Sequence, residues 1–374
     1  MSGRRKALRQ FLIDAQKLGF YDVGETIEGL ARKLNKPSSE ILKLNSNENF
    51  FVPLDFIRNI LREVIEEIDP RIYPRDETVE LKQAISRYLD VSTKEIVIGP
   101  GSDPFIDLVS RMFLTKDDEA ISITPTFSIY ERCVKIQGAK YKAVPLKDDF
   151  SLDTKRILAS VTPRAKIIFL CSPNNPTANL FNREDFLCLT EGFDGIVAVD
   201  EAYADFSRGS VVNLAEKAEN LIVFRTFSKV FGLAGLRIGY AIANQDLATV
   251  IDERFQLPYN VSLVTLKASV KMLEKIHVIK DATEKLKIER EKLIKRLNQI
   301  DGVHAFDSET NFVLFQTEKS SDIVYEELLQ KGIIVRNIGR VLNLQNCLRV
   351  TVAPSHMMEK FLIELDEVLN KNVD

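Results

Sequence analysis

Three short stretches of the sequence carry side chains that could do chemistry together. Lys229 follows the apolar run 221–225 and stands among hydroxyl residues, so its amine could be kept out of water and form a Schiff base. Asp200 ends the apolar run 195–199, where burying a carboxylate is costly unless a partner pairs with it. The turn Gly99 to Asp103 could present backbone amides to a phosphate at the start of a helix.

Each of these features has a simpler explanation when it is taken alone. A lysine is usually a solvated surface residue, and an aspartate after a strand often caps the next helix. Asn175, in the turn 172–177, could equally be an ordinary turn residue that precedes a proline. Chemistry is favoured because all of these stretches follow predicted strands of one sheet, at the edge where ligands bind.

The predicted strands are short runs that are nearly continuous in Val and Ile. Such runs suit strands buried on both faces of a mainly parallel sheet, and helical stretches separate them. The runs are 95–99, 119–124, 166–171, 195–200, 221–225 and 238–242. The sequence therefore predicts the α/β class, with a large domain built on a mainly parallel sheet flanked by helices.

A change in amino-acid composition near residue 265 predicts a domain boundary. Residues 265–299 are densely charged with spaced apolar residues, which predicts one connecting helix. Strands at 311–315, 332–336 and 347–352 and a helix near 321–331 then predict a smaller α+β domain. We expect residues 1–46 to pack on that domain or on a partner subunit, residues 47–268 to form the large domain and residues 269–374 the small one.

Composition excludes several classes of protein. The chain of 374 residues is 45% hydrophobic with a net charge of -3, so it buries a large core and lacks the basic excess that nucleic acid attracts. Its cysteines and histidines show no metal-binding spacing, so we expect reduced thiols, no metal and a cytoplasmic location. No apolar run is long enough to span a bilayer, so we expect no membrane partner.

A dinucleotide-binding protein is one alternative for the glycine-rich turn. Gly99 and Gly101 match the start of the Gly-x-Gly-x-x-Gly fingerprint, but Pro104 replaces its third glycine. The next strand ends in Thr124 and Pro125 and not in the acid that would hold a ribose. The pattern therefore weighs against a dinucleotide.

Longer motifs extend over nearly the whole chain. They are Tyr21–Glu28, Leu44–Asn49, Arg71–Pro74, Gly99–Asp103, Pro125–Tyr130, Ser172–Thr177, Val199–Tyr203, Arg225–Lys229, Leu233–Tyr240, Leu257–Ser262 and Cys347–Thr351. On these motifs the sequence resembles the fold-type I pyridoxal-phosphate-dependent aminotransferases, and among them the histidinol-phosphate aminotransferases. Two positions depart from the family pattern. Ala178 stands where glycine is usual, which puts the loop conformation in doubt, and Phe50 stands where proline is frequent.

The resemblance implies pyridoxal 5'-phosphate as cofactor and a role for each residue around it. Lys229 is implied to bind the cofactor covalently and to move protons, and Asp200 to keep the ring nitrogen protonated. Asn175 and Tyr203 are implied to hold the phenolic oxygen, and Phe127 to stack on the ring, although an ordinary core position is its alternative. The phosphate is implied to bind to Gly101, Ser102, Asp103, Thr226, Ser228 and Arg237, with Tyr73 reaching it from the neighbouring subunit of a homodimer.

The resemblance also implies the substrates. These are L-histidinol phosphate and 2-oxoglutarate, which give imidazole-acetol phosphate and L-glutamate in histidine biosynthesis. Arg336 and Arg349 are the implied anion-binding residues, with Asn175 and Tyr21 beside them, because a guanidinium recognises phosphate and carboxylate through the same planar donors. Alone, each arginine would be read as a surface residue.

Three alternatives stay open at this stage. A decarboxylase acting on a phosphorylated amino acid needs the same lysine and the same electron sink, so the cofactor residues do not separate it from an aminotransferase. Aminotransferases for aromatic or aliphatic amino acids remain possible on the same grounds. A binding protein or regulator without catalysis is the third, and it has little need for a lysine with all these partners.

Overall fold

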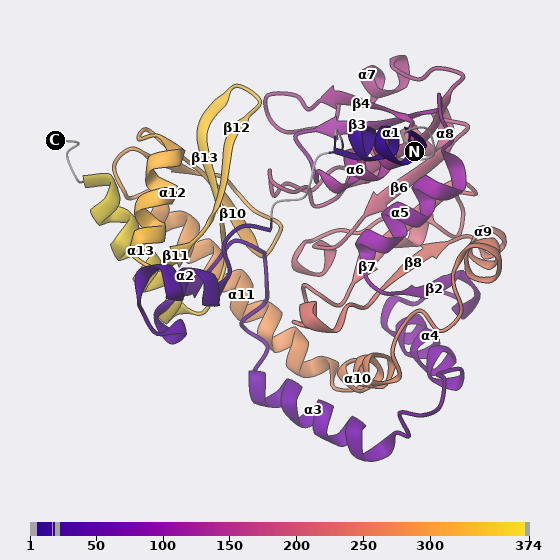
Figure 1. The fold of residues 1–374 in the computed structure, drawn as a ribbon, viewed down its shortest axis with the longest axis horizontal. Helices are drawn as coiled ribbons and strands as arrows, with labels where there is room; N and C mark the ends of the chain where they lie inside the picture. The colour runs from indigo at the N-terminus through magenta and orange to yellow at the C-terminus, as the bar shows by residue number, and fades with distance from the viewer. Residues whose placement is uncertain (1–5, 17, 19–22, 371–374) are drawn as a thin grey trace.

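Two sheets form the framework of the computed structural model, which describes residues 6–16, 18 and 23–370 (Figure 1). The larger sheet has seven strands in the order β2-β8-β7-β6-β5-β3-β4, and the smaller has four in the order β12-β13-β10-β9. The strands of the larger sheet are β2 (Ile96–Gly99), β3 (Glu119–Thr124), β4 (Lys140–Pro145), β5 (Ala165–Cys171), β6 (Ile196–Asp200), β7 (Leu221–Thr226) and β8 (Gly239–Ala243). Those of the smaller sheet are β9 (Val303–Ala305), β10 (Phe312–Thr317), β12 (Arg336–Val341) and β13 (Leu344–Thr351).

The larger sheet is mainly parallel, as the sequence predicts. Strands β4, β3, β5, β6 and β7 pair in parallel, and only β8 runs against its neighbours β7 and β2. Every residue of β2 and β7 is buried, which is why these strands are nearly continuous in apolar residues, with Arg225 and Thr226 at the end of β7 as the polar exceptions. The α/β fold class is therefore confirmed, with the parallel strand ends at one edge of the sheet.

Helices cover the larger sheet. The helix α5 lies against β2, β5, β7 and β8 and packs beside α6 (Figure 1). The helices of this part are α3 (Leu54–Glu67), α4 (Asp76–Leu89), α5 (Ser102–Phe113), α6 (Ile129–Ile136), α7 (Thr154–Ala159), α8 (Arg183–Gly192), α9 (Gln245–Val250) and α10 (Leu263–Glu274). Short 3-10 turns occur at Thr93–Glu95, Ala204–Phe206, Val212–Leu214 and Ala234–Leu236, and a π-helical turn at Ile251–Phe255.

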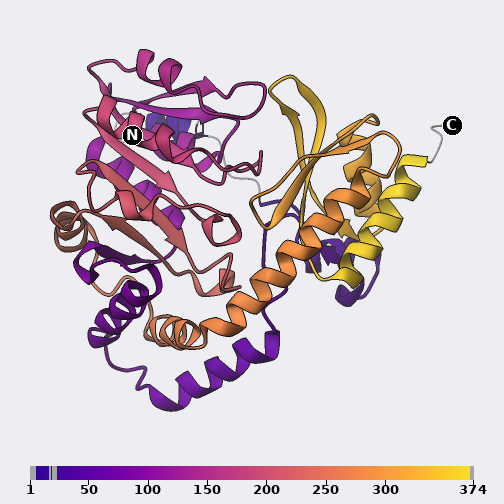
Figure 2. The same cartoon turned by 180° about the vertical axis from the view of Figure 1, so that it is seen from behind.

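The stretch 265–299 is two helices, so the prediction of one connecting helix is wrong. Helix α10 ends at Glu274 and α11 (Ile276–Leu297) begins after Lys275. The break carries no glycine or proline. Its cause is tertiary, because α10 packs on α3 and α4 while α11 packs on β9, β10 and α13 (Ser355–Asn370). Figure 2 shows α11 running from α10 to the smaller sheet.

The smaller sheet packs on α11 and α12 (Ser321–Gln330), α13 packs on these two helices, and the antiparallel pairing of the sheet matches the predicted α+β character. The short strand β1 (Leu42–Lys43) pairs in parallel with β11 (Ile333–Ile334). Helix α2 (Ile27–Leu34), followed by a 3-10 turn at Ser38–Glu40, buries Leu30 and Ala31 against Leu329 and Ile334. The predicted domain boundaries stay a prediction.

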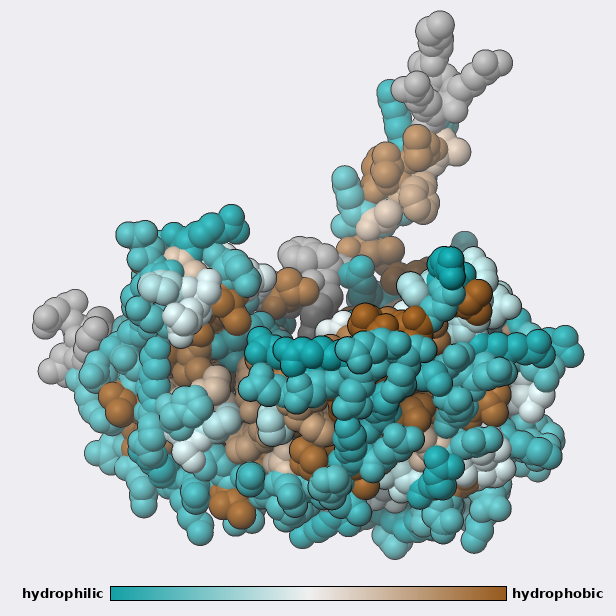
Figure 3. Space-filling view, turned by 90° about the horizontal axis from the view of Figure 1, so that it is seen from below, coloured by the Kyte–Doolittle hydropathy of each residue, from teal (hydrophilic) through white to brown (hydrophobic). Residues whose placement is uncertain are grey.

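Helix α1 (Lys6–Gln16) buries none of its residues. Figure 3 shows it standing away from the body of the molecule, with apolar residues on its surface. Leu8, Phe11, Leu12 and Ile13 are among the large exposed hydrophobic residues. Within the described part of the chain, no helix is both long and apolar enough to cross a membrane.

Candidate active site

One cavity of about 560 Å³ opens where the parallel strand ends of the larger sheet face the smaller sheet. Residues that follow β5, β6 and β7 line one side, and residues of β12 and β13 line the other. The predicted site residues that line it are Ser102, Asp103, Phe127, Asn175, Asp200, Tyr203, Thr226, Ser228, Lys229, Arg237, Arg336 and Arg349. Lys229 and Asp200 therefore share one cavity.

The loop after β7 directs Lys229 into this cavity. Its Nζ donates hydrogen bonds to the backbone oxygens of Ser46 at 2.9 Å and Asn47 at 3.2 Å, and it lies 5.7 Å from the centre of the Tyr203 ring. Burial, and then the Arg349 guanidinium, lowers the pKa of the Lys229 amine to about 8. An appreciable fraction of the amine is thus neutral and nucleophilic near pH 7.

Asp200 ends β6 and is 3% exposed. One carboxylate oxygen accepts the amide of Ala202 at 3.1 Å, and the other accepts the hydroxyl of Tyr130 at 3.2 Å. Burial, and then Asp103, raises the pKa of Asp200 to about 7, while Lys229 and the two donors oppose that rise. A cationic partner in the cavity would therefore stabilise the carboxylate form strongly.

The start of α5 and the loop after β7 form a phosphate seat, by which we mean Gly101, Ser102, Asp103, Thr226, Ser228 and Arg237. Helix α5 begins at Ser102, so its first amides have no partner within the helix, and Ser102 and Asp103 line the cavity. Gly101 adopts a φ of +119°, and a Cβ built on it would lie 3.0 Å from Nη2 of Arg237. Only glycine therefore brings the backbone this close to the guanidinium. The Thr226 hydroxyl donates to Ser228 Oγ at 3.0 Å, which orders the hydroxyls beside the helix start.

Asn175 and Tyr203 lie on the side of the cavity nearest the smaller sheet. The Asn175 side-chain oxygen accepts Nη1 of Arg349 at 2.5 Å, and the Tyr203 hydroxyl accepts Nδ2 of Asn47 at 2.9 Å. Burial raises the pKa of Tyr203 well above its usual range, so it remains a phenol at neutral pH. Phe127 is partly buried and contacts Tyr130 edge to face.

The loop that carries Asn175 keeps a left-handed turn in spite of its alanine. Ala178 is buried and has a φ of +63°, a conformation that glycine adopts more readily. Its amide donates to Asn174 O at 2.8 Å, and its carbonyl accepts the amide of Glu309 at 2.8 Å. The departure from the family pattern therefore costs local strain without displacing Asn175 from the cavity.

Three arginines line the cavity from the smaller sheet, namely Arg336, Arg340 and Arg349. Arg336 and Arg349 are direct cross-strand partners of β12 and β13. Arg349 is buried, donates to Asn45 O at 2.7 Å, and has its guanidinium 5.1 Å from the centre of the Phe312 ring. Like charges placed opposite each other destabilise a sheet. This pairing therefore favours binding of an anion over a structural role.

These residues fit pyridoxal phosphate. The cavity offers an amine for its aldehyde, a buried carboxylate for its ring nitrogen and the phosphate seat for its phosphate. The Oδ1 atom of Asn47 is buried and has no hydrogen-bond partner among the described residues, which is expected where a polar ligand completes the site. Lys229, Asp200 and the phosphate seat lie at separate walls of one cavity, and each has the chemistry that one part of the cofactor requires.

Of the predicted site residues that the structure describes, Gly101 and Tyr73 are not among those that line this cavity. Tyr73 is 75% exposed and stacks on Tyr259 at 4.7 Å between ring centres, away from its own chain's site. Tyr21 lies outside the described residues. No group of three or more metal-binding side chains occurs in the part of the chain that the structure describes.

Sequence reasoning missed several residues of the site. Asn47 and Tyr130 lay within recognised motifs and Arg340 lay outside them, but nothing in the local pattern of these residues indicated a role. Asn47 has a φ of +55° and contacts both Lys229 and Tyr203, and Arg340 lines the cavity from the β12–β13 hairpin. The one signal for such a residue is a buried polar side chain at a left-handed backbone position, as at Asn47, and this signal can be recognised only once the fold is known.

Comparison with known proteins places the chain in a family. The model of the aminotransferase class I and II family matches residues 39–365. The histidinol-phosphate aminotransferase of Caldanaerobacter subterraneus is 37% identical, with 88% of this chain and 93% of that protein covered. That of Methanosarcina mazei is also 37% identical, with 96% of this chain and 95% of that protein covered.

Solved structures agree with this placement. The crystal structure of histidinol-phosphate aminotransferase from Sinorhizobium meliloti in complex with pyridoxal-5'-phosphate is 25% identical, covers 95% of this chain and 96% of that one, and has a TM-score of 0.85. A family match over most of the chain, two relatives above 30% identity and a shared fold point the same way. The chain belongs to the class I and II aminotransferase family.

Proposed function

We propose that this protein is a pyridoxal-phosphate-dependent aminotransferase that transfers the amino group of L-histidinol phosphate to 2-oxoglutarate in histidine biosynthesis. The relatives named above carry that activity in their names. The observation that carries the proposal is one cavity in which Lys229 faces the cross-strand pair Arg336 and Arg349. Such a cavity takes an amino group at one end and an anion at the other.

Lys229 is the proposed catalytic residue. Bound pyridoxal phosphate supplies the electron sink for the charge that develops when the substrate Cα loses its proton. Lys229 would bind the cofactor covalently, and its amine, once freed by the amino substrate, would take the proton from the substrate Cα and deliver it to C4′ of the cofactor. Its pKa of about 8 suits a group that must both accept and donate a proton near neutral pH.

Asp200, Asn175 and Tyr203 hold the cofactor ring. Asp200 would accept a charge-assisted hydrogen bond from the ring nitrogen, which would offset the cost of burying the carboxylate. Asn175 and Tyr203 would donate to the phenolic oxygen of the ring, and Phe127 would cover its face. The phosphate seat binds the phosphate through amides, hydroxyls and the Arg237 guanidinium.

Arg336 and Arg349 bind the distal anion of either substrate. The same two guanidinium groups accept the phosphate of histidinol phosphate and the distal carboxylate of 2-oxoglutarate, because both anions match a planar pair of donors. Tyr21 is a further candidate by resemblance. Because these arginines belong to β12 and β13, movement of the smaller sheet toward the cavity would exclude water and align Cα with Lys229.

We also propose a homodimer in which Tyr73 reaches the phosphate seat of the partner. Tyr73 stacks on Tyr259, and we call these two, together with Ile72 and Leu257, the exposed apolar residues close to them in the sequence, the Tyr73 patch. A second cavity of about 400 Å³ lies beside it, lined by Pro74 and Tyr259. Exposed apolar clusters of this kind are typical of protein interfaces. The unburied face of α1 is a second surface that a partner would cover.

A cytoplasmic location is part of the proposal. A phosphorylated biosynthetic intermediate stays in the compartment where it is made, because its charge opposes transfer across a bilayer.

The decisive experiment is an amino-donor panel with purified protein and 2-oxoglutarate. Histidinol phosphate, histidinol, aromatic and aliphatic amino acids and a phosphorylated amino acid are assayed for glutamate and for carbon dioxide. We expect glutamate with histidinol phosphate at the highest kcat/KM and no carbon dioxide. Release of carbon dioxide from the phosphorylated amino acid would instead identify the decarboxylase.

Borohydride reduction tests the assignment of Lys229. The yellow protein is reduced and digested, and the labelled peptide is mapped by mass spectrometry. The cofactor should be found on Lys229, and Lys229→Ala should lose turnover while it still binds some cofactor. Label on another lysine would contradict the site.

A further inference from the structure

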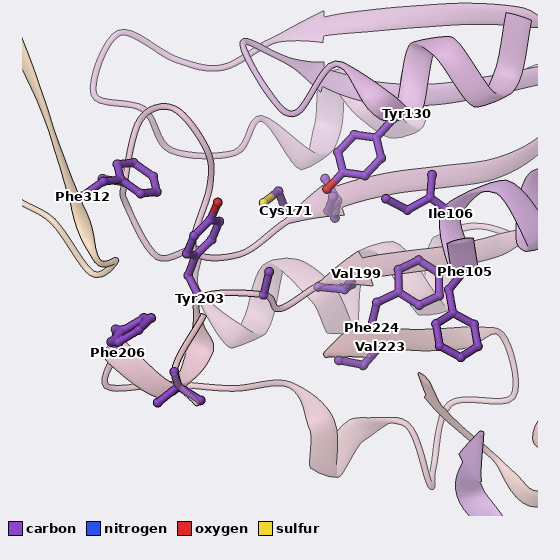
Figure 4. Close-up of a cluster of buried hydrophobic side chains, with 14 of the residues drawn as sticks. Phe105, Ile106, Tyr130, Cys171, Val199, Tyr203, Phe206, Val223, Phe224 and Phe312 are labelled. Carbon is purple, nitrogen blue, oxygen red and sulfur yellow. The ribbon is translucent and has the colours of Figure 1, made fainter. Parts of the chain in front are cut away.

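Tyr130 is fully buried beside the cavity, and its hydroxyl contacts a group that the proposed mechanism uses. It lies on α6, and its hydroxyl donates to Oδ2 of Asp200 at 3.2 Å. Its ring stacks on Phe169 with centres 5.3 Å apart and 3° between the planes, and it meets the edge of Phe127 at 5.8 Å. Figure 4 shows the Tyr130 hydroxyl directed toward the ends of β5 and β6, beside Cys171. The stacking leaves the hydroxyl little freedom to move away.

The proton of this hydroxyl has one good acceptor. The Cys171 thiol also lies within reach of Tyr130, but it donates its own hydrogen to Pro173 O at 3.3 Å and a sulfur is a weak acceptor. Asp200 can only accept while it is ionised. Because the Ala202 amide binds the other carboxylate oxygen at 3.1 Å, the two donors together fix the plane of the carboxylate.

We propose that Tyr130 is a positioning residue that holds Asp200 as an oriented carboxylate facing the ring nitrogen of the cofactor and supports Phe127 against the same ring. This inference rests on the proposed function of the cavity. Tyr130 touches neither the substrate nor the cofactor, since it is not among the residues that line the cavity. It acts through Asp200 and Phe127, which do line it.

The direction in which Tyr130 shifts the pKa of Asp200 follows from the fact that the Asp200 carboxylate is the acceptor of its hydrogen bond. The ionisable groups that face Asp200 are Asp103 on α5, Tyr130 on α6, Cys171 at the end of β5, Tyr203 after β6 and Lys229 after β7. Burial and Asp103 raise the pKa of Asp200, whereas the Tyr130 hydroxyl lowers it. A donor to the carboxylate keeps the shared proton on the ring nitrogen, where it makes the ring the better electron sink. Loss of that donor moves the proton toward Asp200.

The test compares Tyr130→Phe with a matched control. Tyr88→Phe removes another tyrosine hydroxyl that donates to a largely buried aspartate, Asp205, at 2.6 Å, but neither Tyr88 nor Asp205 lines the cavity. Full-length protein without cofactor is labelled with ¹³C at the aspartate carboxyl groups. The Asp200 resonance is assigned by its loss in Asp200→Asn and is followed against pH. We expect Tyr130→Phe to raise the pKa of Asp200 by about one unit and Tyr88→Phe to leave it unchanged.

A second measurement uses the protein loaded with pyridoxal phosphate labelled with ¹⁵N in its ring. In Tyr130→Phe the nitrogen resonance should move toward that of an unprotonated pyridine, and kcat should fall about tenfold with little change in KM. Incorporation of 3-fluorotyrosine at position 130 keeps the hydroxyl and makes it a stronger donor. It should lower the pKa of Asp200, and it provides the test if Tyr130→Phe does not fold.

An Asp200 pKa that is the same in all Tyr130 variants, or that moves equally in Tyr88→Phe, would overturn the assignment of Tyr130. Failure of the unaltered protein to bind pyridoxal phosphate would contradict the proposed function instead. The measurement on the cofactor-free protein decides the role of Tyr130 in either case.

Discussion

Lys229 owes its reactivity to its surroundings more than to its type. An exposed lysine is almost fully protonated at neutral pH, whereas burial and Arg349 lower the pKa of Lys229 to about 8. Only the neutral amine attacks an aldehyde. The rate at which cofactor-free protein captures pyridoxal phosphate should therefore rise with pH and level off above about pH 8, as followed by stopped-flow absorbance.

The variant Arg349→Ala tests how much Arg349 contributes to the lowered pKa of Lys229. Removal of this positive charge favours the protonated amine, so the rising limb of the capture rate should move to higher pH. Arg340→Ala removes an arginine that lines the same cavity but is not among the groups that shift the pKa of Lys229. In this variant the rising limb of the capture rate should stay at the same pH. If the rising limb moved equally in both variants, the net charge of the cavity, and not the position of Arg349, would set the pKa of the Lys229 amine.

Asp200 should make the cofactor-free protein less stable as the pH rises. Its pKa is raised from 3.8 to about 7, so between these values the folded state binds a proton that the unfolded state has released. Stability from this group is therefore full near pH 4 and declines toward pH 7. Asp200→Asn should raise the free energy of unfolding at pH 8 by at most about 4 kcal/mol and by almost nothing at pH 4.

Urea unfolding of the cofactor-free protein at the two pH values measures this change. Asp205→Asn is the control, because Asp205 pairs with Arg225 at 3.1 Å and its loss should destabilise the protein at pH 8. A stabilised Asp200→Asn should also bind pyridoxal phosphate more weakly. Loss of stability at pH 8 would show that Asp200 is already satisfied without a cationic partner.

Residues that stand directly after predicted strands could be found from the sequence. Lys229 and Asp200 are placed in the cavity by nothing more than strand ends meeting at one edge. Tyr130 and Asn47 could not be found in this way. Tyr130 depends on how α6 packs, and Asn47 depends on a left-handed turn that joins elements from both sheets.

At the scale of elements, β6 and β7 are tied together by a buried ion pair. Nε of Arg225 at the end of β7 lies 2.8 Å from Glu201, which follows β6, and both side chains are almost fully buried. The Ser210 hydroxyl donates to the same carboxylate at 2.8 Å. These contacts hold together the strand ends that carry Asp200 and lead into the loop of Lys229.

Glu201→Gln should therefore destabilise the protein by about 1 to 3 kcal/mol, because it removes one of the two carboxylates that pair with the buried Arg225 and leaves Asp205 as the other. The thermal unfolding midpoint measures the effect. Glu309→Gln breaks the exposed pair with Arg208 at 3.0 Å and should cost less than about 1 kcal/mol. Similar losses in the two variants would refute a special role for the buried pair.

The elements themselves were predictable where burial dominates. The strand at 119–124 coincides with β3 because its apolar run is buried on both faces. Strand β4 was missed because this edge strand is largely exposed and its residues carry charges. The division of α10 from α11 was also missed, since it reflects two packing surfaces and no local signal.

At the scale of the whole molecule, the Tyr73 patch should decide assembly. Ile72→Glu combined with Leu257→Glu places two charges in a surface where both side chains are now more than half exposed and apolar. We expect a monomer by sedimentation velocity and at least tenfold weaker cofactor binding, because the partner's Tyr73 no longer reaches the phosphate seat.

The matched control is Ile363→Glu, which changes an exposed isoleucine on α13, outside the Tyr73 patch. It should leave both assembly and cofactor binding unaltered. A dimer that survives the double substitution would move the interface elsewhere, with α1 as the next surface to examine. The sequence predicted this partner only through family resemblance, because nothing in the chain's own pattern distinguishes an interface from other exposed apolar residues.

The pairing of β1 with β11 has a consequence for synthesis on the ribosome. The Leu44 carbonyl accepts the hydroxyl of Thr351, 307 positions later in the sequence, and α2 packs on Ile334. These early segments therefore emerge from the exit tunnel long before their partners are translated, and they wait unpaired through most of elongation. A transcript truncated before the codon for Ile333 would yield a nascent chain whose apolar α2 face remains open to chaperones.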